Sequence, residues 1–394
     1  MAKLIDITGK ALSGEWGTDD ENGNGIPVLR TTNFTNEGLV NYKDVVTRTI
    51  TNKNIDDKFL RKGDIIIEKS GGSDKFPVGR VIYFDGDEKT YLFNNFTGLL
   101  RVKNQNIWYP RYVFYSLYAN YKRGGTRVYE NKTTGLHNLK TDDYVSRYEV
   151  AEVDKTDQIS ICEKLDKVFE IIKLREQELQ LLDTLIKARF VEMFGDPVMN
   201  EKGWRTKSLL DMGDCKNGMN FHYDDYGVEI NCLGVGDFKD LSVIDNVEHL
   251  PMVSLNEMPS EEYLLKDEDI VFVRSNGNKA LVGRSVVVYP GDVSTTFSGF
   301  CIRYRKHEDI VMIPYLLRVL KTDSVRRKMA GRGANIQNLN QQILGTLLIP
   351  IPPIELQNQF ADFVHQVDKS KVAVQKALDE TQMLFDSLMQ KYFG

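Results

Sequence analysis

The sequence has few of the features that mark a secreted or membrane protein. Its four cysteines are scattered and form no C-x-x-C pair, which is typical of a protein kept in a reducing cytoplasm. They are Cys162, Cys215, Cys232 and Cys301. The longest apolar run, Leu344–Ile354, is broken by prolines and is shorter than the ~20 residues of a membrane span. Because Met1-Ala2-Lys3 leads directly into amphipathic sequence, we expect no signal peptide and a cytoplasmic location.

The chain also lacks an excess of basic residues. It has 51 lysines and arginines against 56 aspartates and glutamates, a formal net charge of −5 at pH 7. A protein that holds nucleic acid by bulk electrostatics is normally strongly basic. If this protein binds DNA, local loops or a partner must therefore supply the phosphate contacts.

Motifs of nucleotide-dependent and metal-dependent enzymes are missing as well. Gly71–Arg80 does not supply the phosphate-binding pattern G-x-x-x-x-G-K-[ST], and no G-x-G-x-x-G opens a helix. Neither F-x-G-x-G nor the Asn- or Asp-Pro-Pro-aromatic motif of amino-methyltransferases occurs. The histidines show no metal-ligand spacing; they are His137, His222, His249, His307 and His365. We predict no catalytic residue, no metal site and no cofactor in this chain.

One pair of carboxylates, Asp64 and Glu68, falls on one face of a predicted strand and fits a nuclease. The second half of the chain keeps the aspartate, as Asp269, but has Val273 in place of the glutamate. We therefore interpret the pair as part of a solvated edge strand. A stand-alone metal-dependent nuclease remains a rival hypothesis that rests on this pair.

What the sequence does have is a long heptad stripe in each half. The first stripe is Ile161, Leu165, Val168, Ile172, Arg175, Leu179, Leu182, Ile186, Arg189, Met193. The second is Phe360, Val364, Val367, Lys371, Val374, Leu378, Thr381, Phe385, Leu388, Tyr392. Both step 4-3-4-3 at a constant offset of 199 residues, which Gln158 and Gln357 share. This spacing is the seam of a helix that pairs with another helix.

The duplication extends upstream of the two stripes. Leu60–Gly72 resembles Leu264–Gly277 at an offset of 205 residues, and Asn138-Leu139 matches Asn338-Leu339 at 200. A shrinking offset is what small loop deletions leave in a diverged copy. Identity within the matched blocks is low, so we expect the copies to share a fold more than a surface.

Each half is predicted to place short strands before its long helix. The strands are Asp64–Glu68, Gly79–Phe84 and Thr97–Val102, then Asp269–Arg274, Gly283–Tyr289 and Gly299–Arg305. Helices are predicted at Trp108–Tyr121 and Ile313–Ala330, at corresponding places. The first long helix, at roughly 158–194, is capped by Asp154 and Asp157 and ended by Gly195-Asp196-Pro197. Pro352-Pro353 opens the second.

Each heptad helix can pair in one of two ways, with a second copy of the chain or with the other helix of the same chain. A stripe of this length is commonly a plain dimerisation coiled coil. The polar seam positions differ, however, since Ile172 corresponds to Lys371 and Leu182 to Thr381. An internal pair is therefore favoured over a homodimer. The residues predicted to pack in it are Ile161, Leu165, Val168, Ile172, Leu179, Phe360, Val364, Val367, Val374 and Leu378.

Together these features resemble the specificity (S) subunit of Type I restriction–modification systems, over essentially the whole chain. The matching segments are Ile26–Phe34, the LRKGDIII and KDEDIVFV blocks, Gly331–Asn340, Ile349–Phe360 and Leu384–Gly394. Two details depart from the family. Leu356 stands where a glutamate is usual, and no Pro-Pro precedes the first long helix.

The resemblance implies an α+β fold with two similar α/β target recognition domains. Each is followed by a long helix, and the helices pair as an antiparallel coiled coil with pseudo-twofold symmetry. The expected boundaries are 1–156 for the first recognition domain, 157–195 for the central spacer helix, 196–203 for a linker, 204–350 for the second recognition domain and 351–394 for the C-terminal spacer helix.

The resemblance also implies a DNA-reading subunit without catalytic activity. Each recognition domain reads one half of a bipartite, asymmetric target, and the helices dock two methyltransferase (modification) subunits. Those partners carry S-adenosylmethionine and methylate adenine N6, and restriction subunits bring ATP and Mg²⁺. The partners can also supply much of the phosphate affinity that this chain's charge does not.

The length of the heptad helix predicts the spacing between the two half-sites. Ile161 to Met193 spans 32 residue steps, or ~48 Å at about 1.5 Å per residue. Half-sites on one face of B-DNA lie ~34–36 Å apart, one helical turn. From this spacing we expect half-sites of a few base pairs with a gap of roughly six to eight.

Candidate DNA contacts lie in loops that follow matched strands. Ser70–Lys75 and Ser275–Lys279 mix glycine with small polar and basic groups, and Gly331–Asn338 combines basic and amide side chains. The predicted contacts are Ser70, Gly72, Lys75, Arg80, Arg123, Arg127, Thr134, Asn138, Arg274, Asn276, Lys279, Arg284, Arg327, Arg332, Asn335 and Gln337. A plain hairpin turn or a solvated loop is the alternative. Tyr223 and Tyr226 could approach bases, but core packing is favoured for them.

A third hypothesis is a coiled-coil adaptor whose globular domains bind protein partners. It shares the heptad helices with the DNA-reading hypothesis and differs in its ligand. Exchanging the first globular domain between relatives discriminates the two, because only the DNA reader changes its DNA specificity.

Overall fold

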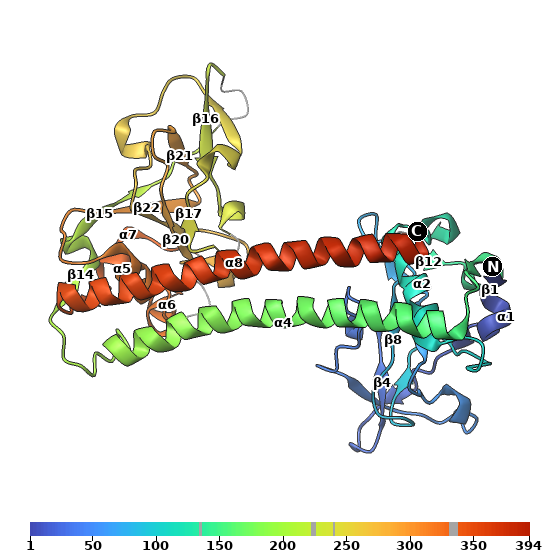
Figure 1. Cartoon of the computed structure of the whole chain (residues 1–394). Helices are drawn as coiled ribbons and strands as arrows, with labels where there is room; N and C mark the ends of the chain where they lie inside the picture. Colours follow the sequence, from blue (N-terminus) through green and yellow to red (C-terminus); the bar gives the residue numbers. More distant parts are fainter. Residues whose placement is uncertain (134–135, 222–225, 239–240, 331–337) are drawn as a thin grey trace. The chain divides into compact units, whose positions relative to one another are not determined.

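The computed structural model describes residues 1–133, 136–221, 226–238, 241–330 and 338–394 (Figure 1). The chain divides into two compact units. The first comprises 1–176 and 376–394, and the second comprises 177–375. Both divisions fall inside the long helices, so each unit holds part of both. The domain boundaries expected from the sequence, which end at the helix starts, remain a prediction.

The central sheet of the first unit has four antiparallel strands in the order β2-β10-β6-β8. Their bounds are Leu12–Ser13 (β2), Thr97–Leu100 (β10), Ile65–Glu68 (β6) and Val81–Tyr83 (β8). The three strands predicted for this half are therefore confirmed, with ends that differ by up to two residues. Runs of isoleucine, leucine and valine account for them, because such side chains pack well on a pleated surface.

The interpretation of Asp64 and Glu68 as part of a solvated edge strand is wrong. Strand β6 lies between β10 and β8. Asp64 is 2% exposed and Glu68 is 4% exposed. The carboxylates tolerate burial because arginines next to the neighbouring strands pair with them, at 2.6 Å for Arg101, just after β10, and at 3.4 Å for Arg80, just before β8.

Three further sheets complete the strands of the first unit. One has the order β3-β5-β4-β9, with bounds Thr18–Asp19, Val46–Thr49, Ile26–Leu29 and Leu92–Phe93. Another has the order β11-β12-β7, with bounds Glu130–Thr133, Leu136–Leu139 and Ser70–Gly72. The third pairs β1 (Ala2–Lys3) with β13 (Glu149–Val150). The short helices are α1 (Leu4–Thr8), α2 (Pro110–Lys122) and α3 (Thr141–Arg147).

The helix predicted at Trp108–Tyr121 is confirmed as α2, which packs on strand β8. Pro110 stands at its start, where a missing N–H costs nothing. Its aromatic side chains fill the core of the unit, with Tyr112 at 1% and Phe114 at 2% exposed.

The second unit repeats this arrangement with longer strands. Its main sheet has the order β15-β22-β19-β20-β17, with bounds Gly213–Asn217, Cys301–Lys306, Asp269–Val273, Ser285–Val288 and Val243–Ile244. A second sheet has the order β18-β16-β21, with bounds Met252–Leu255, Val228–Leu233 and Thr295–Phe297. Strand β14 (Thr206–Ser208) pairs with β23 (Leu348–Pro350). The three strands predicted in this half are confirmed as β19, β20 and β22.

The single helix predicted at Ile313–Ala330 is two helices. They are α5 (Ile313–Leu320) and α6 (Asp323–Ala330), and a further short helix is α7 (Gln341–Gly345). The break falls at Lys321 and Thr322. The Thr322 hydroxyl donates to the Val319 carbonyl at 2.7 Å, which offers the backbone an alternative to the helical ladder.

Single turns of 3-10 helix connect these elements in both units. Their bounds are Thr31–Asn33 (η1), Asp56–Lys58 (η2), Arg127–Tyr129 (η3), Leu209–Asp211 (η4), Val235–Asp237 (η5), Val247–His249 (η6), Glu261–Tyr263 (η7) and Lys279–Leu281 (η8).

The two long helices are α4 (Lys155–Phe194) and α8 (Ile354–Phe393), each of 40 residues. Gly195 ends α4 with φ at 75°, a left-handed conformation that suits glycine, as predicted. The α4 backbone begins from Asp154, whose carbonyl accepts from Gln158 N at 2.9 Å. Pro353 lies just before the first residue of α8 rather than in its first turn.

Within each unit the two long helices contact one another. In the first unit, the rings of Phe169 and Phe385 lie 6.0 Å apart between centroids, and Arg175 donates to the Thr381 hydroxyl. In the second unit, Phe190 and Phe360 lie 5.5 Å apart.

The predicted seam residues mostly join the two cores. Leu165 and Ile172 are buried in the first core, with Ile161, Val168 and Leu378 packed against it. Phe360 and Val367 are buried in the second core, with Val364 packed against it. Leu179 and Val374 are half-buried. Among the helices in the described part of the chain, none is both long and apolar enough to cross a membrane.

Candidate nucleic-acid interface

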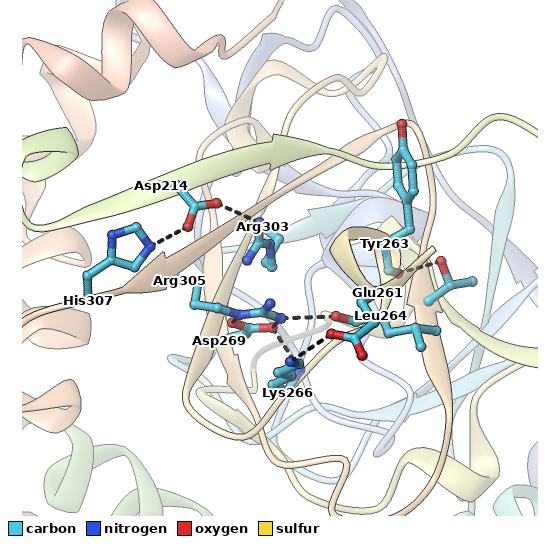
Figure 2. A network of polar contacts seen from close by, with 10 residues as sticks. Asp214, Glu261, Tyr263, Leu264, Lys266, Asp269, Arg303, Arg305 and His307 are labelled. Atoms are coloured by element: carbon cyan, nitrogen blue, oxygen red, sulfur yellow. Dashed lines mark hydrogen bonds and ion pairs between the residues drawn. The ribbon is translucent and has the colours of Figure 1, made fainter. Parts of the chain in front are cut away.

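A carboxylate–guanidinium pair anchors the main sheet of each unit in the same way. In the first unit, Arg101 Nε and Nη2 donate to the two oxygens of Asp64 at 2.7 and 2.6 Å. In the second, Arg305 Nε and Nη2 donate to Asp269 at 2.8 and 2.7 Å (Figure 2). This hydrogen bonding raises the pKa of Arg305. Asp64 and Asp269 differ by the 205 residues of the sequence repeat.

The backbone contacts around these pairs are duplicated too. Asp64 accepts from the N–H of Arg61 at 2.8 Å, and Asp269 from the N–H of Lys266 at 2.8 Å. Each carboxylate is thus held by one guanidinium and one backbone amide, an arrangement in which a buried charge is paired and hydrogen-bonded. Asp64 therefore has a framework role. In the described residues, no group of three His, Cys, Asp or Glu side chains is placed to hold a metal ion.

Glu68 and Arg80 form a second buried pair in the first unit. Burial raises the pKa of Glu68, and the nearby Arg80 guanidinium opposes this effect. Arg80 also donates to the carbonyls of Phe34 and Thr31 at 3.0 and 2.9 Å. Arg80, a predicted DNA contact, therefore also fixes the turn of η1.

A buried glutamine joins each long helix to its unit. The Gln158 carbonyl accepts from Tyr109 N at 2.8 Å, and its amide donates to Ile107 O and Val153 O at 3.0 and 2.9 Å. We call this the glutamine clasp. It fixes the start of α4 against the start of α2.

Gln357 makes the same three bonds in the second unit. Its carbonyl accepts from Met312 N at 2.8 Å, and its amide donates to Ile310 O and Pro352 O at 3.0 and 2.9 Å. Gln158 is 1% exposed and Gln357 is not exposed. The repeat of the sequence is thus a repeat of individual hydrogen bonds.

The loops predicted to contact DNA are brought together in each unit. In the first, β7 and β12 pair with Ser70 opposite Asn138, and Leu139 N donates to Lys69 O at 2.8 Å. In the second, Ser275 and Asn338 form an antiparallel bridge. Segments that lie more than 60 residues apart in the sequence therefore meet at Ser70 and Asn138 in the first unit and at Ser275 and Asn338 in the second, where residues 331–337 lie outside the described part of the chain.

A basic groove lies beside this surface in the first unit. It consists of two adjoining hollows of 390 and 200 Å³ that share Asn36, Phe76, Pro77 and Tyr121. Four cations line the first hollow, namely Lys75, Lys122, Arg123 and Arg127. The second is lined by Gly72 and Arg80, among others. We call this the first-unit groove; it collects five of the predicted DNA contacts.

Two of these cations are positioned by backbone carbonyls. Arg127 donates to the Asp74 carbonyl at 3.3 Å. Arg123 donates to the carbonyl of Phe393, at the C-terminal end of α8. A cation suits a helix C-terminus, where carbonyl groups lack intrahelical partners.

The predicted contacts of the second unit are less concentrated. Arg274 donates to the Gly299 carbonyl at 3.1 Å, and Asn276 accepts from Asn278 N at 2.8 Å. Lys279 begins η8, Arg327 is exposed on α6, and Arg284 lines a separate cleft. Thr134, Arg332, Asn335, Gln337 and Tyr223 lie outside the described residues. Tyr226 is 81% exposed, so core packing is the wrong expectation for it.

Comparison with known proteins gives the family. The family model for the Type I restriction modification DNA specificity domain matches residues 1–184 and 201–381. The chain belongs to this family. The two matches correspond to the two copies of the sequence repeat.

One relative from this specificity family aligns along most of the chain, and another aligns along part of it. The Type I restriction enzyme StySPI specificity subunit of Salmonella potsdam is 24% identical over 404 residues, which cover 93% of this chain and 81% of the relative. The EcoKI specificity subunit of Escherichia coli strain K12 is 31% identical over 118 residues, covering 28% of this chain and 25% of the relative.

Solved structures show the same fold. The S subunit of a Type I system from M. genitalium gives a TM-score of 0.54 at 16% identity, with 100% of this chain and 95% of that chain covered. A chain from a structural study of complex assembly and conformational transition of the type I R-M system gives 0.59 at 15% identity, covering 100% and 96%. The mixed α/β fold predicted from the family resemblance is confirmed at this level.

Sequence reasoning missed several residues of the first-unit groove in this specificity-domain protein. Asn36, Phe76, Tyr121 and Lys122 line it without having been predicted. Phe76 is 54% exposed and lies 5.3 Å from the Lys75 ammonium. The sequence pattern could have indicated Phe76 as a candidate DNA contact, because it is an aromatic residue beside a lysine in a glycine-containing loop. Asn36 lies 40 residues from it in the sequence and carried no such signal.

Proposed function

We propose that this chain is the non-catalytic DNA sequence-recognition subunit of a Type I restriction–modification complex, and that each unit reads one half of a bipartite, asymmetric target. The observation that carries the proposal is a shared framework with unshared surfaces. The carboxylate anchor and the glutamine clasp recur in both units, whereas two aromatic residues of the first-unit groove do not. The offset of 204 residues between Arg80 and Arg284 places Ala280 at the position of Phe76, and the offset of 203 between Tyr109 and Met312 places Ser324 at that of Tyr121. Two unlike half-sites require such a combination.

The first-unit groove supplies both kinds of contact that DNA recognition needs. Lys75, Lys122 and Arg127 bring positive charge that suits backbone phosphates. Asn36 brings an amide that can read base edges. The groove thus concentrates phosphate affinity locally in a chain whose net charge is −5.

The two long helices act in this proposal as a spacer. Helix–helix contacts such as Phe169 with Phe385 and Phe190 with Phe360 support an antiparallel coiled coil with pseudo-twofold symmetry. The spacing between the half-sites then follows from helix length, with a gap of roughly six to eight base pairs.

Two methyltransferase subunits and, where present, restriction subunits are the protein partners in this proposal. Apolar side chains on α4 support docking. Ile171 and Leu174 are 42% and 56% exposed in the first unit. Leu181 and Leu185 are 67% and 47% exposed in the second. The partners bring S-adenosylmethionine, ATP and Mg²⁺, and the assembly works in the cytoplasm.

Co-expression with the cognate methyltransferase subunit, followed by genome-wide mapping of N6-methyladenine, tests the proposal. The expected result is one bipartite motif with a fixed gap, methylated only when this chain is present. A stable complex that leaves no motif, although the same methyltransferase is active with another specificity subunit, contradicts it and favours the adaptor hypothesis.

A further inference from the structure

A cation-rich cleft in the second unit is not explained by the proposed reading of DNA bases. It has a volume of 510 Å³ and lies among α4, β20, α5 and α6. Five cations line it, namely Lys187, Arg284, Arg318, Lys321 and Arg326. Asp183 is the one acid in the lining, and it pairs with Lys371. Asp183 also attracts Arg318 and Lys321, and Asp323 attracts Arg318 and Arg326, so the five cations outnumber the acids that act on them.

Several donors of the cleft have no hydrogen-bond partner in the described part of the chain. These are Arg318 Nε, Arg326 Nη1 and Ser285 Oγ. Arg326 Nη2 donates to the Ala280 carbonyl at 3.1 Å, so its guanidinium is held in place while part of it stays unpaired. Uncompensated buried charge is costly, and an anion in the cleft offsets that cost.

The environment of Lys321 shows how strongly the cations act on one another. Burial and the nearby Arg318 lower the pKa of Lys321 to about 8. The Lys321 ammonium donates to Leu241 O at 3.2 Å and to Ser242 Oγ at 2.6 Å. Neither acceptor is charged, so these bonds do not neutralise it.

Three of the five cations have no counterpart in the first unit. The offset of 203 residues between the clasped segments, Tyr109 and Met312, places Tyr118 at the position of Lys321 and Tyr115 at that of Arg318. The offset of 199 places Asp386 at the position of Lys187. Arg284 and Arg326 correspond to Arg80 and Arg123, at offsets of 204 and 203 residues. The fold of the first unit is built without counterparts of Lys187, Arg318 and Lys321, so the fold of the second does not require these three.

We propose that this cleft binds phosphate groups. Its volume lies in the range of small-ligand sites, and arginine and lysine are the side chains that recognise phosphate. The phosphate comes either from a free di- or triphosphate or from the DNA backbone. If the phosphate belongs to the DNA backbone, the inference extends the proposed function and rests on it. If the phosphate belongs to a free polyphosphate, the inference is independent of the proposed function.

The test measures binding of inorganic tripolyphosphate to the full chain by calorimetry. Wild-type protein is expected to bind, and Lys321→Met and Arg318→Met each to weaken binding by about tenfold or more. Lys369→Met, an exposed lysine on α8 of the same unit, is the matched control and leaves binding unchanged. Circular dichroism confirms that each variant is folded.

Three results overturn the proposal. The wild type does not bind tripolyphosphate, both cleft variants bind it as tightly as the wild type, or the Lys369→Met control loses as much affinity as the cleft variants. If binding is found, a competition separates the two sources of phosphate. A DNA duplex without the target sequence displaces tripolyphosphate if the cleft takes backbone phosphate, and leaves it bound if the cleft takes a free polyphosphate. Since tripolyphosphate binding and the methylation motif are separate readouts, this proposal can fail while the proposed function stands.

Discussion

At the scale of single residues, the buried and the exposed charges of this protein do two different jobs. Asp64 and Asp269 are fully paired and hold the main sheets. Arg123 and Arg127, in the first-unit groove, are instead held by neutral carbonyls, so their charge stays available to a ligand. Arg80 of the same groove pairs with Glu68 and also holds the turn of η1, so it combines both roles.

The carboxylate anchor is expected to contribute stability and not catalysis. Asp64→Ala leaves Arg101 partly buried without its partner, which lowers the free energy of unfolding by about 3–5 kcal/mol. Urea denaturation followed by circular dichroism measures this change. Asp57→Ala removes a carboxylate that is 94% exposed and serves as the control, with an effect within about 0.5 kcal/mol. Equal stability of the Asp64 variant and the control contradicts the framework role.

The cations of the first-unit groove are expected to contact phosphate. In the complex with methyltransferase, Lys75→Met and Arg127→Met should each weaken DNA binding about equally for all sequences. Each should also reduce the slope of log affinity against log salt by about 0.9, because one fewer counterion-releasing contact is made. Fluorescence anisotropy over a salt series gives both quantities. An unchanged slope places these side chains away from the DNA.

At the scale of elements, the sequence predicted those whose signal is local. The strands around Ile65–Glu68 and Asp269–Val273 follow from runs of β-branched residues, and the end of α4 follows from Gly195. The burial of Asp64 was missed because its partner, Arg101, lies 37 residues away. The break between α5 and α6 was missed because apolar periodicity continues across it while Thr322 bonds back to Val319.

The candidate site could be predicted only in part for the same reason. The repeat identified the loops that contain Ser70 and Asn138, since both have counterparts in the second copy. It did not show that β7 and β12 pair, nor that Asn36 reaches the same groove. Those contacts join distant segments whose proximity is a property of the folded chain.

The glutamine clasp is expected to control the start of α4. Gln158→Ala leaves Tyr109 N–H and the carbonyls of Ile107 and Val153 without this partner. Each buried group that stays unsatisfied lowers the free energy of unfolding by about 1–3 kcal/mol at most. Hydrogen exchange at the Tyr109 amide should become faster. Gln177→Ala, an exposed glutamine on the same helix, serves as the control. Unchanged protection of Tyr109 excludes the clasp as a stabilising contact.

The exposed leucines of α4 are expected to bind the methyltransferase subunits. Leu174→Glu and Leu181→Glu place a charge in the proposed apolar contact and should abolish the complex in size-exclusion chromatography. The isolated variants should keep their helix content. Val128→Glu, at a position that is 80% exposed, is the control for adding a surface charge. Complex formation by both leucine variants would move the docking surface elsewhere.

At the scale of the whole molecule, the proposed function assigns one half-site to each unit and makes the two long helices the spacer between them. The duplicated framework makes the two units alike in construction, and under the proposed function their different side chains read different half-sites. The two long helices are the elements that follow the heptad repeat of the sequence. Any change in helix length that keeps the heptad register should therefore change the target's gap and leave its half-sites as they are.

The measurement that tests this account most directly is the methylation motif of a lengthened variant. Seven residues are inserted after Glu176 in α4 and seven after Gln375 in α8, where the two units divide. One heptad adds ~10.5 Å to each helix, or about three base pairs at ~3.4 Å each. The account predicts the wild-type half-sites with a gap about three base pairs longer. An unchanged gap, or altered half-sites with the same gap, contradicts it.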